Sequence, residues 1–129
     1  MRRLVPVLIT TLVLPAFAQD ALPLRRGFYV QEPTPCARAS NATLTLFDGR
    51  GFNVSQAECR IVRKQQVGNA FDIREDCRDI RSGSPIEGGT ERITPTQTGF
   101  NRSSGGETTR WRYCPQSQLP SPWRNNRIQ

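Results

Sequence analysis

Hydrophobic and polar residues alternate along much of the chain, a pattern typical of half-buried β-strands. The clearest case is the stretch from Glu58 to Arg78, where two alternating segments flank a central Gly68-Asn69 pair. Gly and Asn adopt positive φ angles at little steric cost, which favours a tight turn between antiparallel strands. We therefore expect a β-hairpin, and a turn centred near Gly68 places Cys59 and Cys77 roughly opposite each other on one face.

Other segments with the same alternation predict further strands, separated by residues that favour turns. These strands are expected at residues 27–31, 42–48, 90–100 and 108–114, with polar loops at residues 80–89 and 101–107. No segment after residue 18 has the pattern of an amphipathic helix. About six strands at this spacing predict an all-β fold, a small antiparallel meander closed into a barrel or folded as a sandwich.

The last predicted strand raises a question about which face belongs to the core. Trp111 and Tyr113 share one face of this strand, and Arg110 and Arg112 share the other. Strict alternation then puts Cys114 on the face of the arginines, although a disulfide is expected in the core. Either the strand ends at Tyr113 and the chain turns, or this register is wrong.

The first 18 residues have the features of a signal peptide. Arg2 and Arg3 precede an apolar stretch of about 15 residues, short of the roughly 20 that a membrane-spanning helix needs. The stretch ends in Ala16-Phe17-Ala18, which matches the small-x-small pattern of cleavage sites, and no transmembrane span is expected after cleavage. The expected organisation is a signal peptide at 1–18, a disulfide-bonded β domain at 19–114, and a disordered tail with three prolines at 115–129.

Four cysteines follow the predicted signal peptide: Cys36, Cys59, Cys77 and Cys114. An even number in an exported protein predicts two disulfides, and the absence of His and of any Cys-x-x-Cys pair gives no support for a metal site. Three pairings are possible, and the sequence does not choose between them. Sequential pairing, Cys36 with Cys59 and Cys77 with Cys114, ties both flanks to the hairpin, whereas a Cys59–Cys77 bridge spans the hairpin itself.

The chain is basic, with 18 Lys and Arg residues against 11 Asp and Glu residues. Loss of Arg2 and Arg3 with the signal peptide leaves 16 basic residues and a net charge of +5. A positive charge suits an anionic partner such as an envelope component, and it also keeps a small exported protein soluble. No nucleic-acid partner is expected, because an exported protein rarely meets nucleic acid.

The residues on which most hydrolases depend are missing from this chain. It has no His, which excludes Ser-His-Asp and Cys-His catalysis. Glu75, Asp76 and Asp79 form a carboxylate cluster interleaved with arginines, for which cross-strand ion pairing is the simpler explanation. The alternative function is a carboxylate-dependent glycan-active enzyme that uses Glu75 or Asp79 as acid or base. Alternation places Glu75 on the apolar face, so its carboxylate is expected near the barrel mouth or paired.

The favoured function is therefore a non-enzymatic exported binding module, periplasmic or secreted, with no catalytic residue, cofactor or metal. Its partner would be a protein, such as a hydrolase that it inhibits, or an anionic envelope component. Loops at residues 48–55 and 81–89 are expected to bind this partner. Arg50 and Phe52 are the expected contacts, since Arg and aromatic residues are enriched at binding hot spots. In the alternative interpretation, Phe52 lies in the core and Arg50 is merely solvated.

The order of these features resembles that of a group of bacterial proteins. A GFYV strand, a Pro-Cys turn, the stretch ASNATLTLFDGRG and three further cysteines follow one another. This order is similar to that of small uncharacterised exported (periplasmic) β proteins of bacteria, and the resemblance carries no catalytic residues. The expected architecture is also like that of periplasmic lysozyme inhibitors, which are small β-barrels with a disulfide, although their inhibitory loop motif cannot be placed on this chain.

Overall fold

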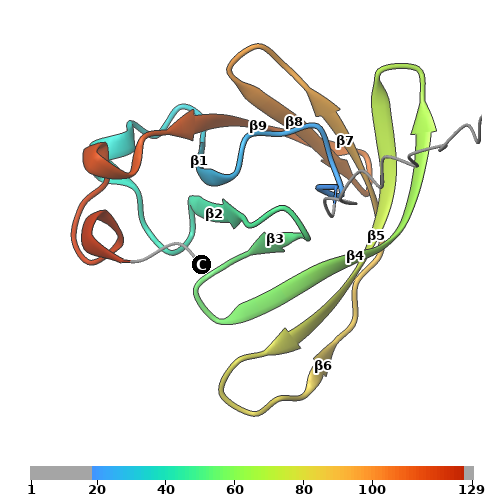
Figure 1. The fold of residues 1–129 in the computed structure, drawn as a ribbon, viewed down its shortest axis with the longest axis horizontal. Helices are drawn as coiled ribbons and strands as arrows, with labels where there is room; N and C mark the ends of the chain where they lie inside the picture. The colour runs from blue at the N-terminus through green and yellow to red at the C-terminus, as the bar shows by residue number, and fades with distance from the viewer. Residues whose placement is uncertain (1–18, 127–129) are drawn as a thin grey trace, which may run out of the picture.

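The computed structural model describes residues 19–126, so the expected signal peptide at 1–18 lies outside the described residues. Regular structure in this part of the chain consists of β-strands and three short 3₁₀ helices (Figure 1). The strands are β1 (Gly27–Gln31), β2 (Leu44–Phe47), β3 (Phe52–Asn53), β4 (Ala57–Val67), β5 (Ala70–Asp79), β6 (Pro85–Ile86), β7 (Thr90–Pro95), β8 (Gly99–Ser104) and β9 (Glu107–Cys114). The 3₁₀ helices are η1 (Cys36–Arg38), η2 (Gln116–Gln118) and η3 (Trp123–Asn125). None of the helices between residues 19 and 126 has the length and apolar character needed to cross a membrane.

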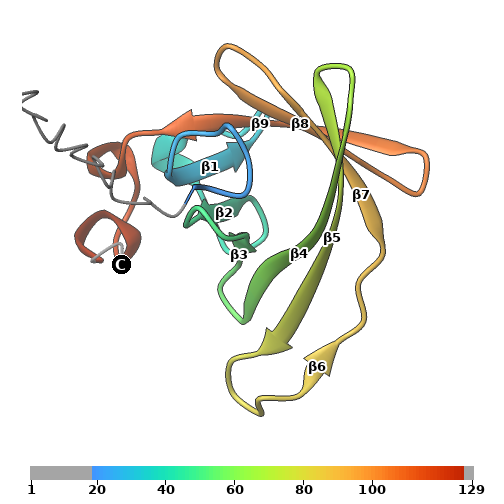
Figure 2. The same ribbon diagram turned by 45° about the vertical axis from the view of Figure 1, so that its right-hand side comes forward.

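All strands belong to one antiparallel sheet in the order β3-β2-β1-β9-β8-β7-β5-β4, with β6 paired to β5 beside this path. Pairing of β1 with β9 joins the beginning of the domain to its end. The two ends of the sheet meet through a Val54–Ala57 bridge and a 2.8 Å hydrogen bond from the Ile61 amide to the Arg50 carbonyl. The sheet therefore curls into a nearly closed barrel (Figure 1, Figure 2). The predicted all-β fold is confirmed, with eight strands along the path rather than about six.

The barrel is filled by apolar residues from the inner face of each strand, as alternation requires. Tyr29, Phe47, Phe52 and Phe100 form an aromatic cluster in which neighbouring ring centroids lie 5.0 to 5.2 Å apart. Leu22, from the segment before β1, adds to this core and is 2% exposed. The interior is thus packed with side chains, and binding is left to the outer surface.

The predicted hairpin is confirmed: β4 pairs with β5, and Gly68 lies in the turn with a φ of +61°. Cys59 lies directly opposite Cys77, and the two form a disulfide with a Cα–Cα distance of 4.1 Å. Cys36 forms the second disulfide with Cys114. Sequential pairing is therefore wrong, because the hairpin register brings the two inner cysteines together and leaves the two outer ones for each other. Two disulfides are typical of proteins that work in an oxidising environment outside the cytoplasm.

A second, smaller core lies on the outer face of β1 and β2. Phe28, Val30 and Leu44 belong to it, and Leu119, from the segment after β9, packs with them and is 1% exposed. Residues 115–126 thus differ from the expected disordered tail, since η2 and η3 lie in this segment and Leu119 is anchored in the second core. This segment is ordered because the outer face of β1 and β2 is apolar. Leu119 covers part of that face and so shields apolar surface from water.

Cys114 belongs to this second core. Alternation along β9 continues to its end, with Tyr113 paired to Tyr29 and Cys114 paired to Phe28. Cys114 therefore shares a face with Arg112, as strict alternation requires, and it is nevertheless fully buried. Neither an early strand end nor a register error is needed. A buried Cys114 conflicts with strict alternation only if the protein is assumed to have a single core.

One predicted strand is divided. Alternation predicts a single strand over residues 90–100 and a polar loop after it, whereas the structure has β7, a turn at residues 96–98, and then β8. β8 continues to Ser104, and the chain turns at Gly105-Gly106, where both residues have positive φ. The strand escapes prediction because Arg102 occupies an inward-facing position where alternation requires an apolar residue.

Candidate functional site

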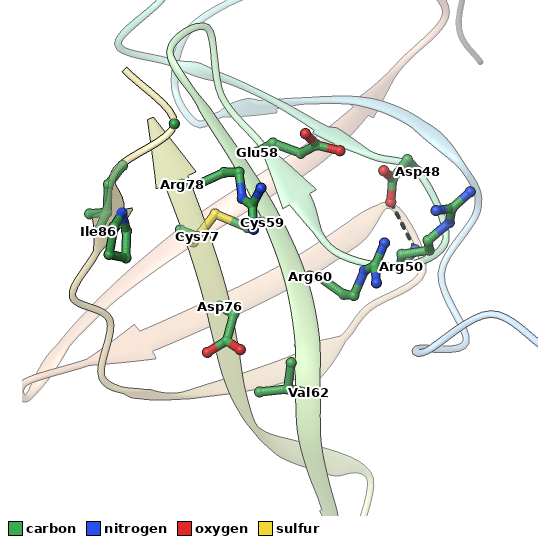
Figure 3. Close-up of a pocket in the computed structure, with 12 residues that line it drawn as sticks. Asp48, Arg50, Glu58, Cys59, Arg60, Val62, Asp76, Cys77, Arg78 and Ile86 are labelled. Atoms are coloured by element: carbon green, nitrogen blue, oxygen red, sulfur yellow. Dashed lines mark hydrogen bonds between the residues drawn. A yellow bond between two sulfur atoms is a disulfide. The ribbon is translucent and has the colours of Figure 1, made fainter. Parts of the chain in front are cut away.

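A large open groove runs along the base of the β4–β5 hairpin (Figure 3). Its volume is about 690 Å³, and residues of β4, β5, β6 and the β2–β3 turn line it. We call it the hairpin groove. Its lining combines charged and apolar residues with the Cys59–Cys77 disulfide: Asp48, Arg50, Glu58, Arg60, Val62, Asp76, Arg78, Gly83, Pro85 and Ile86.

The β2–β3 turn holds Arg50 at the groove. The Asp48 carboxylate accepts hydrogen bonds from the backbone amides of Arg50 (2.8 Å) and Gly51 (3.0 Å), and its other oxygen accepts one from the Asn53 side chain (2.9 Å). A Cβ at Gly51 would lie 2.3 Å from the Cys59 carbonyl oxygen, so only glycine lets the turn pack this closely on β4. The Arg50 backbone is thereby fixed, while its side chain remains exposed at the groove.

Charges of both signs line the groove on facing positions of the hairpin. Glu58 lies opposite Arg78 on the neighbouring strand, and Arg60 lies opposite Asp76. Within residues 19–126, however, no carboxylate approaches the Arg50, Arg60 or Arg78 guanidinium within 4.0 Å. These three arginines keep their hydrogen-bonding capacity for a ligand, since each guanidinium carries five N–H donors.

Two exposed apolar side chains add to the groove. Val62 is 51% exposed, at the β-bulge where the β4–β5 register shifts between Ile61 and Arg63. Ile86, from the short strand β6, is 42% exposed. Apolar patches beside unpaired arginines are typical of protein-binding surfaces, in which Arg is enriched and Lys is depleted.

The two predicted contact residues have different surroundings. Arg50 lines the groove, whereas Phe52 is 2% exposed and packs between Phe47 and Phe100. The Phe52 ring also lies 4.6 Å from the Arg102 guanidinium carbon inside the barrel. In this structure the Phe52 ring therefore has no access to a partner, in line with the alternative interpretation of that residue as core.

The second predicted loop reaches the same groove. Residues 81–89 are all exposed, and Pro85 and Ile86 line the groove together with Arg50. The Asp79 carboxylate holds the start of this loop, because it accepts hydrogen bonds from the amides of Arg81 (2.8 Å) and Ser82 (3.0 Å). The fold thus brings together the two loops that the sequence singles out.

Sequence reasoning missed the hairpin residues of the groove, above all Arg60, Val62 and Arg78. The signal was present, because these residues occupy solvent-facing positions of a hairpin whose register was predicted. What the sequence lacked was the position of the β2–β3 turn beside β4, which depends on barrel closure.

Glu75 has a largely buried side chain on the inner face of β5 and is paired, as its position on the apolar face predicts. Its carboxylate accepts hydrogen bonds from the Phe52 amide (3.1 Å) and from Arg102 (3.2 Å), and the Arg102 Nε lies 2.8 Å from the Glu91 carboxylate. Burial raises the pKa of Glu75, although the Phe52 hydrogen bond and the Arg102 charge act in the opposite direction. The network has two carboxylates for one guanidinium.

This arrangement does not bring two carboxylates together for glycan cleavage. Glu75 and Asp79 are four residues apart on β5, which separates them by about 13 Å along a strand. Paired carboxylates in glycosidases lie about 5–9.5 Å apart. In addition, Asp79 is engaged in holding the turn, and the Glu75 side chain is only 10% exposed.

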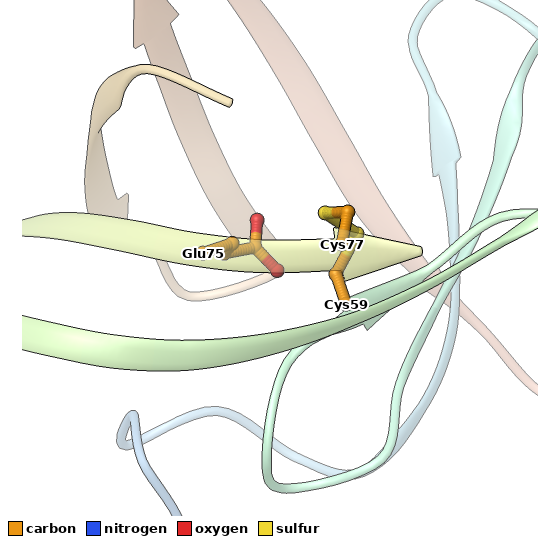
Figure 4. Close-up of side chains that lie close together, drawn as sticks. All are labelled: Cys59, Glu75 and Cys77. Carbon is orange, nitrogen blue, oxygen red and sulfur yellow. A yellow bond between two sulfur atoms is a disulfide. The ribbon is translucent and has the colours of Figure 1, made fainter. Parts of the chain in front are cut away.

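Glu75 also lies beside the hairpin disulfide, in the one arrangement within residues 19–126 that resembles a metal site (Figure 4). Ligand atoms of Cys59, Glu75 and Cys77 all lie within 4.8 Å of one another. A metal-binding cysteine supplies a thiolate, and here the two sulfur atoms are bonded to each other. The oxidised protein therefore has no thiolate at this position.

Comparison of the chain with protein-family models, with curated proteins and with solved structures gave no significant match. The function is therefore inferred from the geometry of the chain itself.

Proposed function

We propose that this protein is a non-enzymatic binding module of the periplasm or the extracellular space, and that it binds a partner protein through the hairpin groove. The observation that carries this proposal is the set of exposed arginines Arg50, Arg60 and Arg78, which have no carboxylate partner among residues 19–126 and lie beside the exposed Val62 and Ile86. Arginine is among the residues that most often dominate binding energy.

The framework around the groove suits this role. The Cys59–Cys77 disulfide crosslinks the two strands at the base of the groove, and the Asp48 hydrogen bonds fix the neighbouring turn. A surface held in one conformation loses little conformational entropy when a partner binds. The export expected from residues 1–18 agrees with the two disulfides, which form and persist in oxidising compartments.

The mixed charge of the groove favours a protein partner over a polyanion. Glu58 and Asp76 alternate with Arg60 and Arg78 on facing strands, so the groove is not uniformly positive. A polyanionic envelope component would be repelled by these carboxylates, whereas a protein surface can place complementary charges opposite each of them.

The experiment is a pull-down from envelope extract with the mature, oxidised protein, followed by affinity measurement with the purified partner. Replacement of Arg50 and Arg60 by Ala should weaken binding of that partner by about tenfold or more, because each lost charged hydrogen bond costs about 1.5–3 kcal/mol. The matched control replaces Arg38 and Arg124, which are exposed and do not line the groove, and it should bind like the wild type. Equal binding by both double variants would contradict the proposed site.

A second candidate is a glycan-active enzyme in which Glu75 or Asp79 acts singly, because the two are too far apart to form a carboxylate pair. The observation in its favour is the burial of the Glu75 side chain, which raises the pKa of its carboxyl group. Its test is the release of reducing ends from a panel of envelope polysaccharides by the wild type and by a variant with Glu75→Gln and Asp79→Asn. Activity that the double variant abolishes would support the enzyme, and no activity on any substrate would count against it.

A further inference from the structure

The hairpin extends past the groove and projects from the barrel (Figure 1, Figure 2). All residues of β4 from Val62 to Val67 are exposed. On the outer edge of β4, within the part of the chain that the structure describes, Ile61 is the last residue with a backbone partner, through its bond to the Arg50 carbonyl. Beyond Ile61, no backbone group of residues 19–126 pairs with the edge from Val62 to Val67, and we call it the open edge.

Backbone alternation shows which groups the open edge presents. The Cα–Cα distance of 4.1 Å between Cys59 and Cys77 is typical of a facing pair without mutual hydrogen bonds, and such residues direct their N–H and C=O groups away from the partner strand. The Ile61 amide, two residues after Cys59, donates its hydrogen bond to Arg50, away from β5, which agrees with this pattern. The β-bulge shifts the pattern by one residue, so the backbone groups of Lys64 and Gln66 face outward.

Two arginines lie directly opposite each other beside this edge. Arg63 on β4 faces Arg74 on β5, and both side chains are exposed. Like charges on facing positions destabilise a sheet. No carboxylate within residues 19–126 lies within 4.0 Å of either guanidinium.

The carboxylates nearest in the sequence do not neutralise this pair. Asp72 forms an ion pair with Arg92, at 2.7 Å. Glu75, next to Arg74 in the sequence, pairs with Arg102 at 3.2 Å. Asp76, two residues after Arg74, lies opposite Arg60 in the groove. The Arg63–Arg74 pair is therefore an unneutralised dication at the margin of a free strand edge.

We propose that the open edge binds an acidic, extended segment of the partner protein as an added β-strand, with Arg63 and Arg74 pairing the carboxylates of that segment. This inference rests on the proposed function and names the chemistry of its partner. Backbone groups of Lys64 and Gln66 supply the hydrogen bonds of strand addition. The two guanidiniums supply charge-assisted hydrogen bonds that a neutral segment cannot accept in the same way.

Charge favours an acidic segment over a second copy of the chain as the binding partner of the open edge. Two open edges set antiparallel would bring the Arg63 and Lys64 side chains of both copies together, at a net charge of +5 on each mature chain. An acidic segment turns the same charges into attraction. The Lys64 ammonium already donates a hydrogen bond to the Ala21 carbonyl (2.8 Å), which leaves Arg63 and Arg74 as the side chains free to pair.

The probe is a blocked hexapeptide of alternating Glu and Val, labelled for fluorescence anisotropy and titrated with the mature, oxidised protein. Wild-type protein should bind it, and the peptide with Gln in place of Glu should bind about tenfold or more weakly. A version N-methylated at alternate residues should also lose binding, because it lacks the donors that pair with the edge. Equal binding of the N-methylated peptide would overturn strand addition.

The matched protein variants are Arg74→Glu and, as a control, Arg38→Glu at an exposed site away from the hairpin. Arg74→Glu should lose peptide binding about tenfold or more and should raise Tm by about 2–4 °C, because it replaces a repulsive pair by an attractive one. Arg38→Glu should bind like the wild type. Wild-type binding by Arg74→Glu, or binding of phosphatidylglycerol vesicles but not of the peptide, would overturn the proposal.

The outcomes separate this proposal from the proposed function. If the peptide does not bind while capture of an envelope protein depends on Arg50 and Arg60, the acidic-strand proposal fails and the binding module stands. If neither binding is found, both fail.

Discussion

Arg102 organises the inside of the barrel and explains why Glu75 can be buried there. Its guanidinium lies 3.2 Å from the Glu75 carboxylate, 2.8 Å from the Glu91 carboxylate and 4.6 Å from the Phe52 ring centroid. Removal of one member of such a group leaves a buried charge without its partner, which is strongly destabilising. Glu75 and Glu91 therefore belong to a structural network inside the barrel, whereas Glu58 and Asp76 are exposed charges of the groove.

The raised pKa of Glu75 predicts how stability changes with pH. A carboxyl group with a higher pKa in the folded protein binds its proton more tightly there, so its contribution to stability is complete below the unfolded pKa and is lost as pH rises through the folded pKa. Thermal unfolding between pH 4 and pH 7 should therefore show a smaller decline with rising pH for Glu75→Gln than for the wild type. A matched Glu107→Gln variant, at the exposed first residue of β9, should keep the wild-type slope. Identical slopes for Glu75→Gln and the wild type would contradict the buried position of Glu75.

At the level of elements, local signals predicted the hairpin and long-range packing decided the rest. The alternation around Gly68 was sufficient for β4 and β5, and their register placed Cys59 opposite Cys77. The second core could not be predicted, because it depends on Leu119 reaching the outer face of β1 across the folded barrel. Of the candidate site, Arg50 was predicted, whereas the open edge depends on where the barrel stops pairing with β4.

Leu119 provides a test of the second core. Leu119→Ala should lower the free energy of unfolding by about 2–5 kcal/mol, as expected for a buried Leu that leaves a cavity. The measurement is denaturant unfolding of the oxidised protein. Ser117→Ala, two residues earlier and exposed, should change stability by no more than about 0.5 kcal/mol. If Leu119→Ala left the free energy of unfolding unchanged, the second core would be contradicted, and residues 115–126 would be the disordered tail that the prolines suggest.

At the level of the whole molecule, the barrel and the groove both depend on the two crosslinks. Cys36–Cys114 ties the segment after β1 to the end of β9, and Cys59–Cys77 fixes the hairpin that carries the groove and the open edge. Each crosslink should contribute about 2–4 kcal/mol, chiefly by restricting the unfolded chain. Reduction should therefore loosen the binding surface together with the fold.

The most direct test of this arrangement is to determine which cysteines are paired. The test is feasible because Arg and Lys residues lie between the four cysteines. Trypsin cleaves after Arg and Lys, which places the four cysteines on four separate peptides, residues 27–38, 51–60, 75–78 and 113–124. Mass spectrometry of the unreduced digest should find 27–38 linked to 113–124 and 51–60 linked to 75–78. Linkage of 27–38 to 51–60 and of 75–78 to 113–124 would contradict the barrel, the hairpin register and the groove built on them.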